Sequence, residues 1–536
     1  MRIPLDRQSA EPLYQQIEAF LRQGILTGSI APDTRLPATR QLARDLGVNR
    51  ITVENAYAEL EADGLVCSRV GSGTYVLPSS PLSPLPRDGP GAPWPLWQQD
   101  LQFRCWVSGV PGILEVPEVS EGELPEELPG ARTARYPHQI SFAGGTGDAG
   151  LFPAEDFRKA IQNVMRRDGI TALEYGERSG YTPLRRTIAH VLASQGLQAR
   201  AENILITSGS QQALALVSQL LLKPGDPILV ESPTYGGALD LFRSLGLRVI
   251  GIPTDERGMR VEMLEELLER YHPKLIYTIP NFHNPTGACM SGQRRRQLVV
   301  LADRYNVPIL EDDFVGDLRY DGRAQPALKA LDPGGRVIYI STFSKMLMPG
   351  LRVGFLVAEG PVYDQLVSYK RVNDLATSNL IQRVLEAYVN VGRYQAHLRR
   401  SRQVYRKRRD AMLLALNRHL PAGVRVDPPQ GGLFIWLRLP GNLSSEKLLP
   451  LALEEGVTFA PGSDFFPDDL GGSDDSDNKL CLRLNFAVQP PKAIEEGIKR
   501  LGRAIMRFLS PDEGRAALRE QGPSAKLSSR SAETGV

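Results

Sequence analysis

STFSKMLMPGLRVG, residues 341–354, combines a hydroxyl-rich turn, a single lysine and an arginine seven positions further on. The amine of Lys345 can condense with an aldehyde to form a Schiff base. Thr342, Ser344 and Arg352 can donate hydrogen bonds to a phosphate group. The stretch therefore predicts a site for an aldehyde cofactor that carries a phosphate.

Short β-rich runs and amphipathic helical stretches alternate around this motif, from about residue 136 to residue 510. Such alternation is typical of an α/β domain in which helices cover a mainly parallel sheet. The predicted strands include Ile204–Thr207, Pro227–Glu231, Leu275–Ile279, Val307–Glu311 and Val337–Ile340.

Length and composition set limits on the class of protein. At 536 residues the chain is too long for a single core, so more than one domain is expected. The hydrophobic content of 42% and the charged content of 23% are ordinary for a soluble globular protein. The net charge of +2 does not by itself indicate nucleic-acid binding.

The chain lacks the patterns of a membrane or secreted protein. No apolar run approaches the roughly 20 residues that cross a bilayer, and the N-terminus shows no signal-peptide pattern. We therefore expect a cytoplasmic location. No close cysteine pair suggests a metal site, and free thiols are expected at Cys67, Cys105, Cys289 and Cys481.

Composition divides the chain into four segments. Residues 1–77 form a compact, helix-rich unit, and residues 136–510 form the α/β domain. Between them, residues 78–135 are rich in Pro and Gly, carry an acidic run and read as a long linker. Residues 511–536 are polar and expected to be disordered. Part of the linker is expected to dock, because it holds Trp94, Trp97 and Trp106.

The N-terminal segment shows the pattern of a helix-turn-helix. Apolar residues recur at helical spacing from Leu13 to Ile25. Thr39 suits the N-cap of a second helix, Gly47 suits a tight turn, and Asn49 suits the N-cap of a third. Beyond it, Leu65–Arg69 and Thr74–Leu77 flank Gly71-Ser72-Gly73 and predict a hairpin wing.

Charge in this segment is local. Residues 1–77 hold eight Arg and nine Asp or Glu, which excludes a strongly basic domain. Residues 35–50, however, carry four Arg and one acid, which is enough for phosphate contact at one face. The alternative is a protein-interaction module whose arginines are merely solvated.

With its wing and its Arg35-Leu36-Pro37 entry, the segment 11–77 resembles the winged helix-turn-helix domain of the GntR regulator family. The resemblance implies that Gly71 and Gly73 bring the wing to the minor groove of DNA. Glu54 stands where some relatives place an arginine, so it is excluded from phosphate contact. The implied contacts to phosphates or base edges are Arg35, Thr39, Arg40, Asn49, Arg50 and Thr52.

Five further segments of the large domain fit one ligand, although each also has a plain structural explanation. Thr207–Ala213 follows a strand and opens a helix, which suits an anion but also any ordinary turn. Tyr235 can stack on a flat ring or simply pack. Asn284 can donate to a phenolate oxygen. Asp312 can pair with a pyridinium nitrogen or merely end a strand. Arg483 can bind a substrate carboxylate or an internal acid.

Together and in this order, these segments resemble the fold-type I aminotransferases, which bind pyridoxal 5′-phosphate (PLP). The resemblance implies a mainly parallel sheet with flanking helices and a smaller α+β subdomain. The resemblance implies a Schiff base at Lys345, with Asp312 on the ring nitrogen, Asn284 on the phenolic oxygen, Tyr235 stacked on the ring and Arg483 on an amino-acid carboxylate. Phosphate contacts are implied for Ser210, Gln211, Thr342, Ser344 and Arg352, and for Tyr175 across a subunit boundary.

One residue departs from this pattern. Relatives usually carry a tyrosine where Phe314 stands, and phenylalanine cannot bond the phenolic oxygen. The loss of one neutral hydrogen bond costs only about 1 kcal/mol, so cofactor binding is not threatened, but full turnover is in doubt.

The fusion of these two parts resembles the MocR subfamily of bacterial regulators. The resemblance implies a head-to-tail homodimer that binds an operator and senses PLP, an amino acid or an amine through Lys345. It also implies association with the nucleoid when the protein is bound to DNA. The alternatives are a working aminotransferase with an added DNA-binding domain, and a degenerate dimerisation scaffold.

Overall fold

The computed structural model describes residues 3–5, 12–26, 29–31, 34–62, 65–69, 73–76, 139–441, 443–467 and 480–509. The predicted linker 78–135 with its tryptophans, the predicted tail 511–536 and Gly71 lie outside the described residues. The chain divides into two compact units, Met1–Pro93 with Arg186–Glu202, and Trp94–Arg185 with Asn203–Val536. Each unit is described by itself.

Three helices and a hairpin make up the N-terminal part, and they share one core. Gly47 turns the chain between the second and third helices with a φ of 64°, a conformation that glycine adopts readily. Ile17, Leu21 and Leu60 are fully buried in this core. The elements are α1 (Leu13–Leu26), α2 (Thr39–Leu46), α3 (Arg50–Ala62), β1 (Val66–Arg69) and β2 (Gly73–Val76).

The two predicted helix caps differ in outcome. Asn49 caps α3, because its Oδ1 accepts the backbone N–H of Ile51 at 3.1 Å. The prediction for Thr39 was wrong: Ala38 occupies the N-cap position of α2 without a side-chain bond, and Thr39 is the first helical residue. The hairpin prediction is confirmed, since β1 and β2 pair antiparallel with Val66 opposite Val76.

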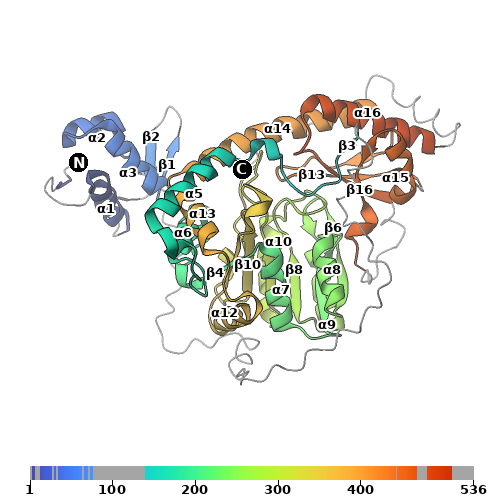
Figure 1. The fold of residues 1–536 in the computed structure, drawn as a ribbon, viewed down its shortest axis with the longest axis horizontal. Coiled ribbons are helices and arrows are strands. Elements are labelled where there is room, and N and C mark those ends of the chain that lie inside the picture. The colour runs from blue at the N-terminus through green and yellow to red at the C-terminus, as the bar shows by residue number, and fades with distance from the viewer. Residues whose placement is uncertain are drawn as a thin grey trace. The chain divides into compact units, whose positions relative to one another are not determined.

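An eight-stranded sheet with the order β4-β11-β10-β9-β8-β5-β6-β7 forms the centre of the second unit (Figure 1). Neighbouring strands from β10 to β6 are parallel, β11 is antiparallel to both neighbours, and β7 closes an edge hairpin with β6. The predicted mainly parallel sheet is confirmed. The bounds are β4 (Ile204–Thr207), β5 (Pro227–Ser232), β6 (Arg248–Asp255), β7 (Gly258–Met259), β8 (Leu275–Thr278), β9 (Ile309–Asp312), β10 (Val337–Thr342) and β11 (Gly354–Val357).

Helices flank this sheet and bury its apolar strands. Ile250, Ile276 and Ile309 belong to one core with Leu268 of α9 and Leu298 of α10. The helices after residue 149 are α5 (Ala154–Asp168), α6 (Thr182–Ser194), α7 (Ser210–Leu221), α8 (Gly236–Ser244), α9 (Leu264–Tyr271), α10 (Gly292–Arg304), α11 (Leu328–Leu331), α12 (Pro361–Asp374), α13 (Asn379–Val389), α14 (Arg393–His419), α15 (Ser445–Glu454) and α16 (Pro491–Phe508).

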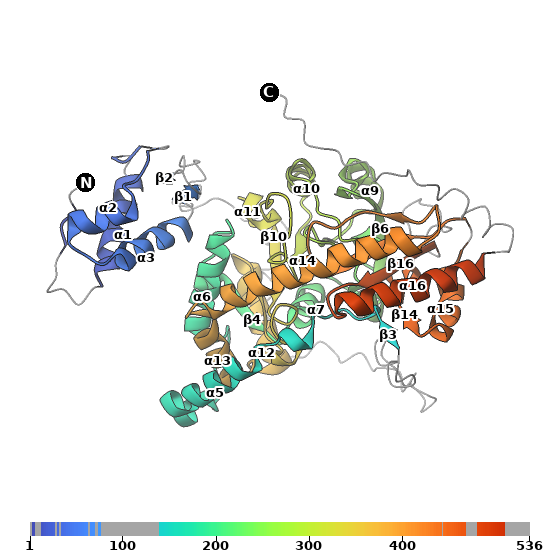
Figure 2. The same cartoon turned by 90° about the horizontal axis from the view of Figure 1, so that it is seen from above.

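A smaller α+β part follows α14, as predicted. Its four-stranded sheet has the order β12-β13-β16-β15 and is antiparallel throughout, and β14 pairs parallel with β3. The long helices α14 and α16 lie side by side over it (Figure 2). The strands are β3 (Ile140–Ser141), β12 (Arg425–Val426), β13 (Phe434–Arg438), β14 (Val457–Thr458), β15 (Ala460–Pro461) and β16 (Cys481–Asn485).

Two sequence expectations bear on the described residues only in part. No helix there combines the length and apolar character needed to span a membrane. Of the described cysteines, Cys289 and Cys481 are not joined in a disulfide, as expected. Cys105 and the side chain of Cys67 lie outside the described residues.

Candidate functional sites

Lys345 stands in the loop after β10, at the carboxyl ends of the parallel strands. Burial, together with the positive charges of Arg483 and Arg352, lowers the pKa of Lys345 to about 8, and the Asp312 carboxylate opposes the shift. Three side chains from segments far apart in the sequence therefore act electrostatically on Lys345. A lysine of lowered pKa is a better nucleophile near neutral pH, because more of it is the neutral amine.

Asp312 ends β9 and is buried. Its Oδ2 accepts a hydrogen bond from the Tyr277 hydroxyl at 3.0 Å. Its Oδ1 is buried and has no hydrogen-bond partner among the described residues. Burial raises the pKa of Asp312 to about 7, although the Tyr277 bond and the Lys345 charge act in the opposite direction. The carboxyl group thus keeps one oxygen available for a ligand.

Three site segments meet in one row of the sheet. Gly354 of β11 lies opposite Thr207 of β4 on one side and opposite Thr342 of β10 on the other. A side chain at Gly354 would place its Cβ 2.6 Å from the carbonyl carbon of Gly209, so only glycine lets the two segments approach. The loop before α7 and the loop after β10 are therefore neighbours.

The predicted phosphate ligands surround this row. Arg352 is exposed and donates from Nη2 to the carbonyl of Ser208 at 2.9 Å. Thr342 and Ser344 are buried, and their hydroxyl groups lie 3.1 Å apart. Ser210 is the first residue of α7, where the helix N-terminus favours an anion.

Gln211 is placed differently from its predicted role. Its side-chain amide donates to the carbonyl of Gly237 at 2.9 Å, so this side chain links α7 to α8. The next residue, Gln212, instead contacts the loop: its Oε1 accepts the backbone N–H of Ser208 at 2.8 Å. Gln211 stays a predicted phosphate ligand only through groups other than the amide that Gly237 occupies.

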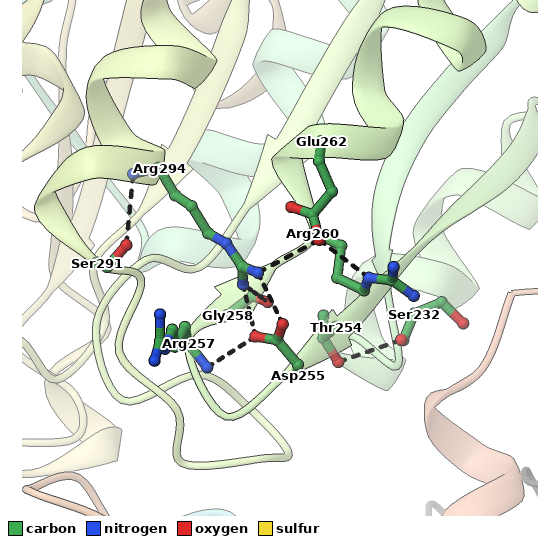
Figure 3. Close-up of polar contacts among 9 residues, drawn as sticks. All are labelled: Ser232, Thr254, Asp255, Arg257, Gly258, Arg260, Glu262, Ser291 and Arg294. Atoms are coloured by element: carbon green, nitrogen blue, oxygen red, sulfur yellow. Dashed lines mark hydrogen bonds and ion pairs between the residues drawn. The ribbon is translucent and has the colours of Figure 1, made fainter.

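Tyr235 lies at the start of α8, in a loop that begins at Ser232. Burial, followed by the nearby Asp312 carboxylate, raises the pKa of Tyr235. The Thr254 hydroxyl of β6 donates to the carbonyl of Ser232 at 3.3 Å. The β6–β7 hairpin is in turn fixed to α10, because Arg294 contacts both oxygens of Asp255 at 2.5 and 2.7 Å (Figure 3). This polar cluster supports the base of the Tyr235 loop.

Asn284 and Arg483 form a buried pair. Arg483 of β16 donates from Nη1 to Oδ1 of Asn284 at 2.8 Å and from Nη2 to the carbonyl of Ala143 at 2.9 Å. Its guanidinium carbon lies 4.2 Å from the ring centre of Phe434 and 4.7 Å from that of Phe465. Burial lowers the pKa of Arg483 to about 10. Because the amide oxygen of Asn284 is occupied, its NH₂ group remains the part that can donate to a ligand.

A strap of small residues, defined as Ala143–Asp148, crosses the site near Lys345. Asn485 is fully buried and donates from Nδ2 to the carbonyls of Gly144 and Thr146, each at 2.8 Å. A Cβ atom at Gly145 would lie 4.0 Å from Nζ of Lys345. The strap therefore forms a wall next to the amine, and Asn485 holds it in place.

Phe314 and Tyr175 are placed differently in the structure. Phe314 is buried and stacks on Phe434 with ring centres 6.4 Å apart. Tyr175 is 85% exposed. Within one chain, the structure does not bring Tyr175 to the other predicted cofactor ligands.

The arrangement fits an aldehyde cofactor with a phosphate and a basic ring nitrogen. Asp312 Oδ1 and Arg483 Nε are buried and without partners among the described residues, and such groups are costly unless a ligand satisfies them. The first suits a protonated ring nitrogen and the second a carboxylate. Lys345 would hold the aldehyde carbon, and the helix N-terminus at Ser210 would face the phosphate.

Among the described residues, the predicted DNA contacts lie on α2 and α3, in the segments just before these helices, and at the start of β2. Arg35, Arg40, Asn49 and Arg50 are exposed, whereas Thr39 and Thr52 are half-buried. Gly73 has a φ of 116°, and a Cβ atom there would lie 2.7 Å from Nε of Arg35. The arginine therefore rests directly on the wing, which agrees with one shared binding face.

Comparison with known proteins supports both halves. Residues 140–501 match the family Aminotransferase class I and II, and residues 13–76 match Bacterial regulatory proteins, gntR family. "Aromatic-amino-acid aminotransferase 1" of Thermococcus litoralis is 39% identical over 372 residues, which cover 68% of this chain and 88% of that protein. "Probable rhizopine catabolism regulatory protein MocR" of Rhizobium meliloti is 32% identical over 509 residues, which cover 94% of this chain and 95% of that protein.

A solved structure of an aminotransferase matches a similar share of this chain as the first of these relatives. The kynurenine aminotransferase of Pyrococcus horikoshii, crystallised with PMP, is 40% identical with a TM-score of 0.66, and the match covers 70% of this chain and 92% of that one.

Fold, site and matches define the class: a GntR-type DNA-binding domain joined to a fold-type I aminotransferase domain that binds PLP. The chain belongs to the MocR-type transcriptional regulators of the GntR family. The predicted fold class, family and cofactor are thereby confirmed.

Several residues of the site were not predicted from the sequence. Tyr277 lies in the buried strand β8, and a buried phenol needs a hydrogen-bond partner. Its position in the sequence could therefore have indicated a polar contact in the site. Asn485 lies two residues after Arg483, and this position was a weaker indication of a site residue. Gly145 gave no signal, because its proximity to Lys345 depends on tertiary structure.

The lowered pKa of Lys345 predicts how cofactor loading depends on pH. Below about pH 8 the fraction of neutral amine, and with it the loading rate, should rise about tenfold per pH unit, and it should level off above. Stopped-flow mixing of cofactor-free protein with PLP measures this rate. An unperturbed lysine, with a pKa near about 10.4, would instead give rates that climb steeply beyond pH 9.

Proposed function

We propose that the large domain is the sensor of this regulator, and that Lys345 is its covalent contact to PLP. The observation that carries the proposal is the convergence of Lys345, Asp312, Arg352 and Arg483 within electrostatic reach in a chain that also holds a DNA-binding winged helix. PLP supplies an aldehyde that can be exchanged between amines. An incoming amine would free the Lys345 side chain, and the changed site would alter the affinity of the winged helix for its operator.

The residues around Lys345 have separate tasks in this proposal. Lys345 presents a larger fraction of neutral amine near neutral pH than an ordinary lysine does, because its pKa is lowered to about 8. Asp312 offers Oδ1 to the ring nitrogen while Tyr277 holds Oδ2. Asn284 offers its NH₂ group, because Arg483 occupies its oxygen. Arg483 keeps Nε for the carboxylate of an amino-acid effector.

The proposal includes a head-to-tail homodimer in which Tyr175 reaches the cofactor of the partner subunit. Support comes from the surface around it, since Ile170 is 71% exposed, Leu173 57% and Tyr175 85%. These apolar side chains lie within six consecutive residues, which is typical of an interaction surface rather than of scattered single residues. A dimer would also match paired DNA half-sites.

A working aminotransferase is the second candidate. It is favoured by the intact set Lys345, Asp312, Asn284 and Arg483 and by the aminotransferase relatives at 39–40% identity. Phe314 argues against efficient turnover, because phenylalanine cannot bond the phenolic oxygen of the cofactor. Sustained transfer from an amino donor to a 2-oxo acid, at roughly 1 s⁻¹ or faster, would support the enzyme. A single half-reaction that stops would support the sensor.

The deciding experiment titrates amino acids and amines against the PLP-loaded full-length protein. Visible absorption reports the chemistry at Lys345, and DNA affinity is read in parallel at fixed salt, since salt alone changes it strongly. The proposal requires that one ligand changes both signals over the same concentration range. The proposal is contradicted if every ligand that changes the absorption leaves DNA affinity unaltered.

The strap predicts which effectors fit. Gly145→Ala places a methyl group in ordinary van der Waals contact with Nζ of Lys345, at 4.0 Å, and so occupies space beside the amine. A ligand bound there should then be overpacked at a cost of ~1–3 kcal/mol, and effector affinity should fall about tenfold. Gly144→Ala is the matched control, because a Cβ there meets nothing within 4 Å and affinity should stay within about twofold. Effector titration by absorption measures both. Equal losses in the two variants would refute a wall at Gly145.

A further inference from the structure

The helix α3 has an outward face that the predicted DNA contacts do not use. Val53, Ala56, Tyr57 and Leu60 are buried and turn one side of α3 to the core. The opposite side carries Ile51, Asn55 and Ala58, which are all exposed. Their spacing of four and three residues places them in one stripe along the helix.

Ile51 is unusual among the residues of this stripe. Its side chain is 61% exposed, although it is large and apolar. It stands in the first turn of α3, where Asn49 accepts its backbone N–H. In a helix-turn-helix the first turns of this helix approach the base edges. A single exposed apolar residue is ordinary elsewhere on a surface. Ile51 is informative because it stands where this helix approaches the base edges.

The neighbouring side chains complete the chemistry of a base-reading surface. Arg50 bonds Glu54 through Nε at 2.6 Å, so its guanidinium group is held beside the stripe. Asn55 lies one turn beyond Ile51 and offers both a donor and an acceptor, which is the pattern that pairs with adenine in the major groove. An apolar side chain is the partner for the thymine methyl group.

We propose that Ile51 contacts the 5-methyl group of a thymine and that Asn55 reads an adenine, so that this stripe selects an A·T-containing step in each half-site. Four residues of helix rise about 6 Å and neighbouring bases are about 3.4 Å apart, so the two side chains reach base pairs no more than about two steps apart. The inference rests on the DNA-binding function of the winged helix and adds the base classes that it reads.

The test uses the PLP-loaded full-length protein and a pool of random-sequence duplex DNA at fixed salt. After selection of a bound site, each thymine is replaced in turn by deoxyuridine, which removes only the methyl group. Replacement of one thymine per half-site should weaken binding about three- to fivefold, the effect of losing one buried methyl contact. Ile51→Ala should bind the thymine and deoxyuridine forms equally well. Asn55→Ala should lose the preference for adenine at one position.

Controls separate the possible failures. Phe20→Ala removes another exposed apolar side chain, on α1, and should keep the deoxyuridine sensitivity. Unchanged thermal unfolding of Ile51→Ala would show that the fold is intact. Insensitivity of the unaltered protein to every replacement, or full sensitivity in Ile51→Ala, overturns the inference. Failure to select any duplex would instead overturn the DNA-binding function itself.

Discussion

Lys345→Ala will abolish the visible absorption band near ~420 nm that PLP gives when joined to a lysine, together with effector-responsive DNA binding. The reason is chemical, since the structure places this amine beside Asp312, Arg352 and Arg483 and lowers its pKa to about 8. Absorption after dialysis against PLP, and DNA affinity with and without effector, measure the two results.

Two control variants sharpen this experiment. Lys345→Arg keeps the positive charge but cannot form the covalent bond, so it should behave like Lys345→Ala. Lys159→Ala removes an exposed lysine and should retain both the band and the response. If Lys345→Ala keeps the band and the response, Lys345 is not the covalent contact and the proposed sensor mechanism fails.

Arg483→Met will distinguish an amino-acid effector from a simple amine. Loss of a buried charged partner costs about 2–5 kcal/mol, so affinity for an amino acid should fall roughly 30-fold or more. Affinity for the amine that lacks the carboxylate should change by less than about threefold, because that ligand does not need Arg483. Paired titrations of an amino acid and its decarboxylated analogue measure the difference.

The control for this second experiment must account for the structural bonds of Arg483. Its loss leaves the oxygens of Asn284 and Ala143 without their donor, which should lower the free energy of unfolding of the protein whichever ligand is bound. Arg483→Lys keeps a charge but loses the two-pronged geometry, and should give an intermediate loss for the amino acid alone. Equal losses for amino acid and amine would refute a carboxylate role for Arg483.

Sequence patterns predicted the parts of this molecule that depend on local chemistry. The strand bearing Asp312, the turn at Gly47 and the lysine loop follow from periodicity and residue type, because buried strands and tight turns restrict which residues occur. The prediction that Thr39 is an N-cap was wrong, because a hydroxyl residue near a helix start can lie either at the N-cap or one residue inside the helix.

Contacts between distant segments could not be predicted in this way. Tyr277 meets Asp312 only because β8 and β9 are parallel neighbours, with Tyr277 opposite Leu310. The strap is held near Lys345 by residues distant in sequence, since Asn485 binds two of its carbonyls and Arg483 binds a third. Such contacts depend on strand order and register, which a single sequence does not reveal.

The row formed by Thr207, Gly354 and Thr342 has a consequence for how this domain tolerates change. The loops predicted to face the phosphate leave the sheet at one level from β4 and β10, the two strands on either side of β11, so their spacing is set by strand register and not by loop sequence. Insertions in remote surface loops would leave that spacing intact. Deletion of a single residue within β11 would shift every pairing on both of its sides and reverse the faces of its side chains. Mutational tolerance should therefore be lowest along this short antiparallel strand, which itself carries none of the predicted ligands.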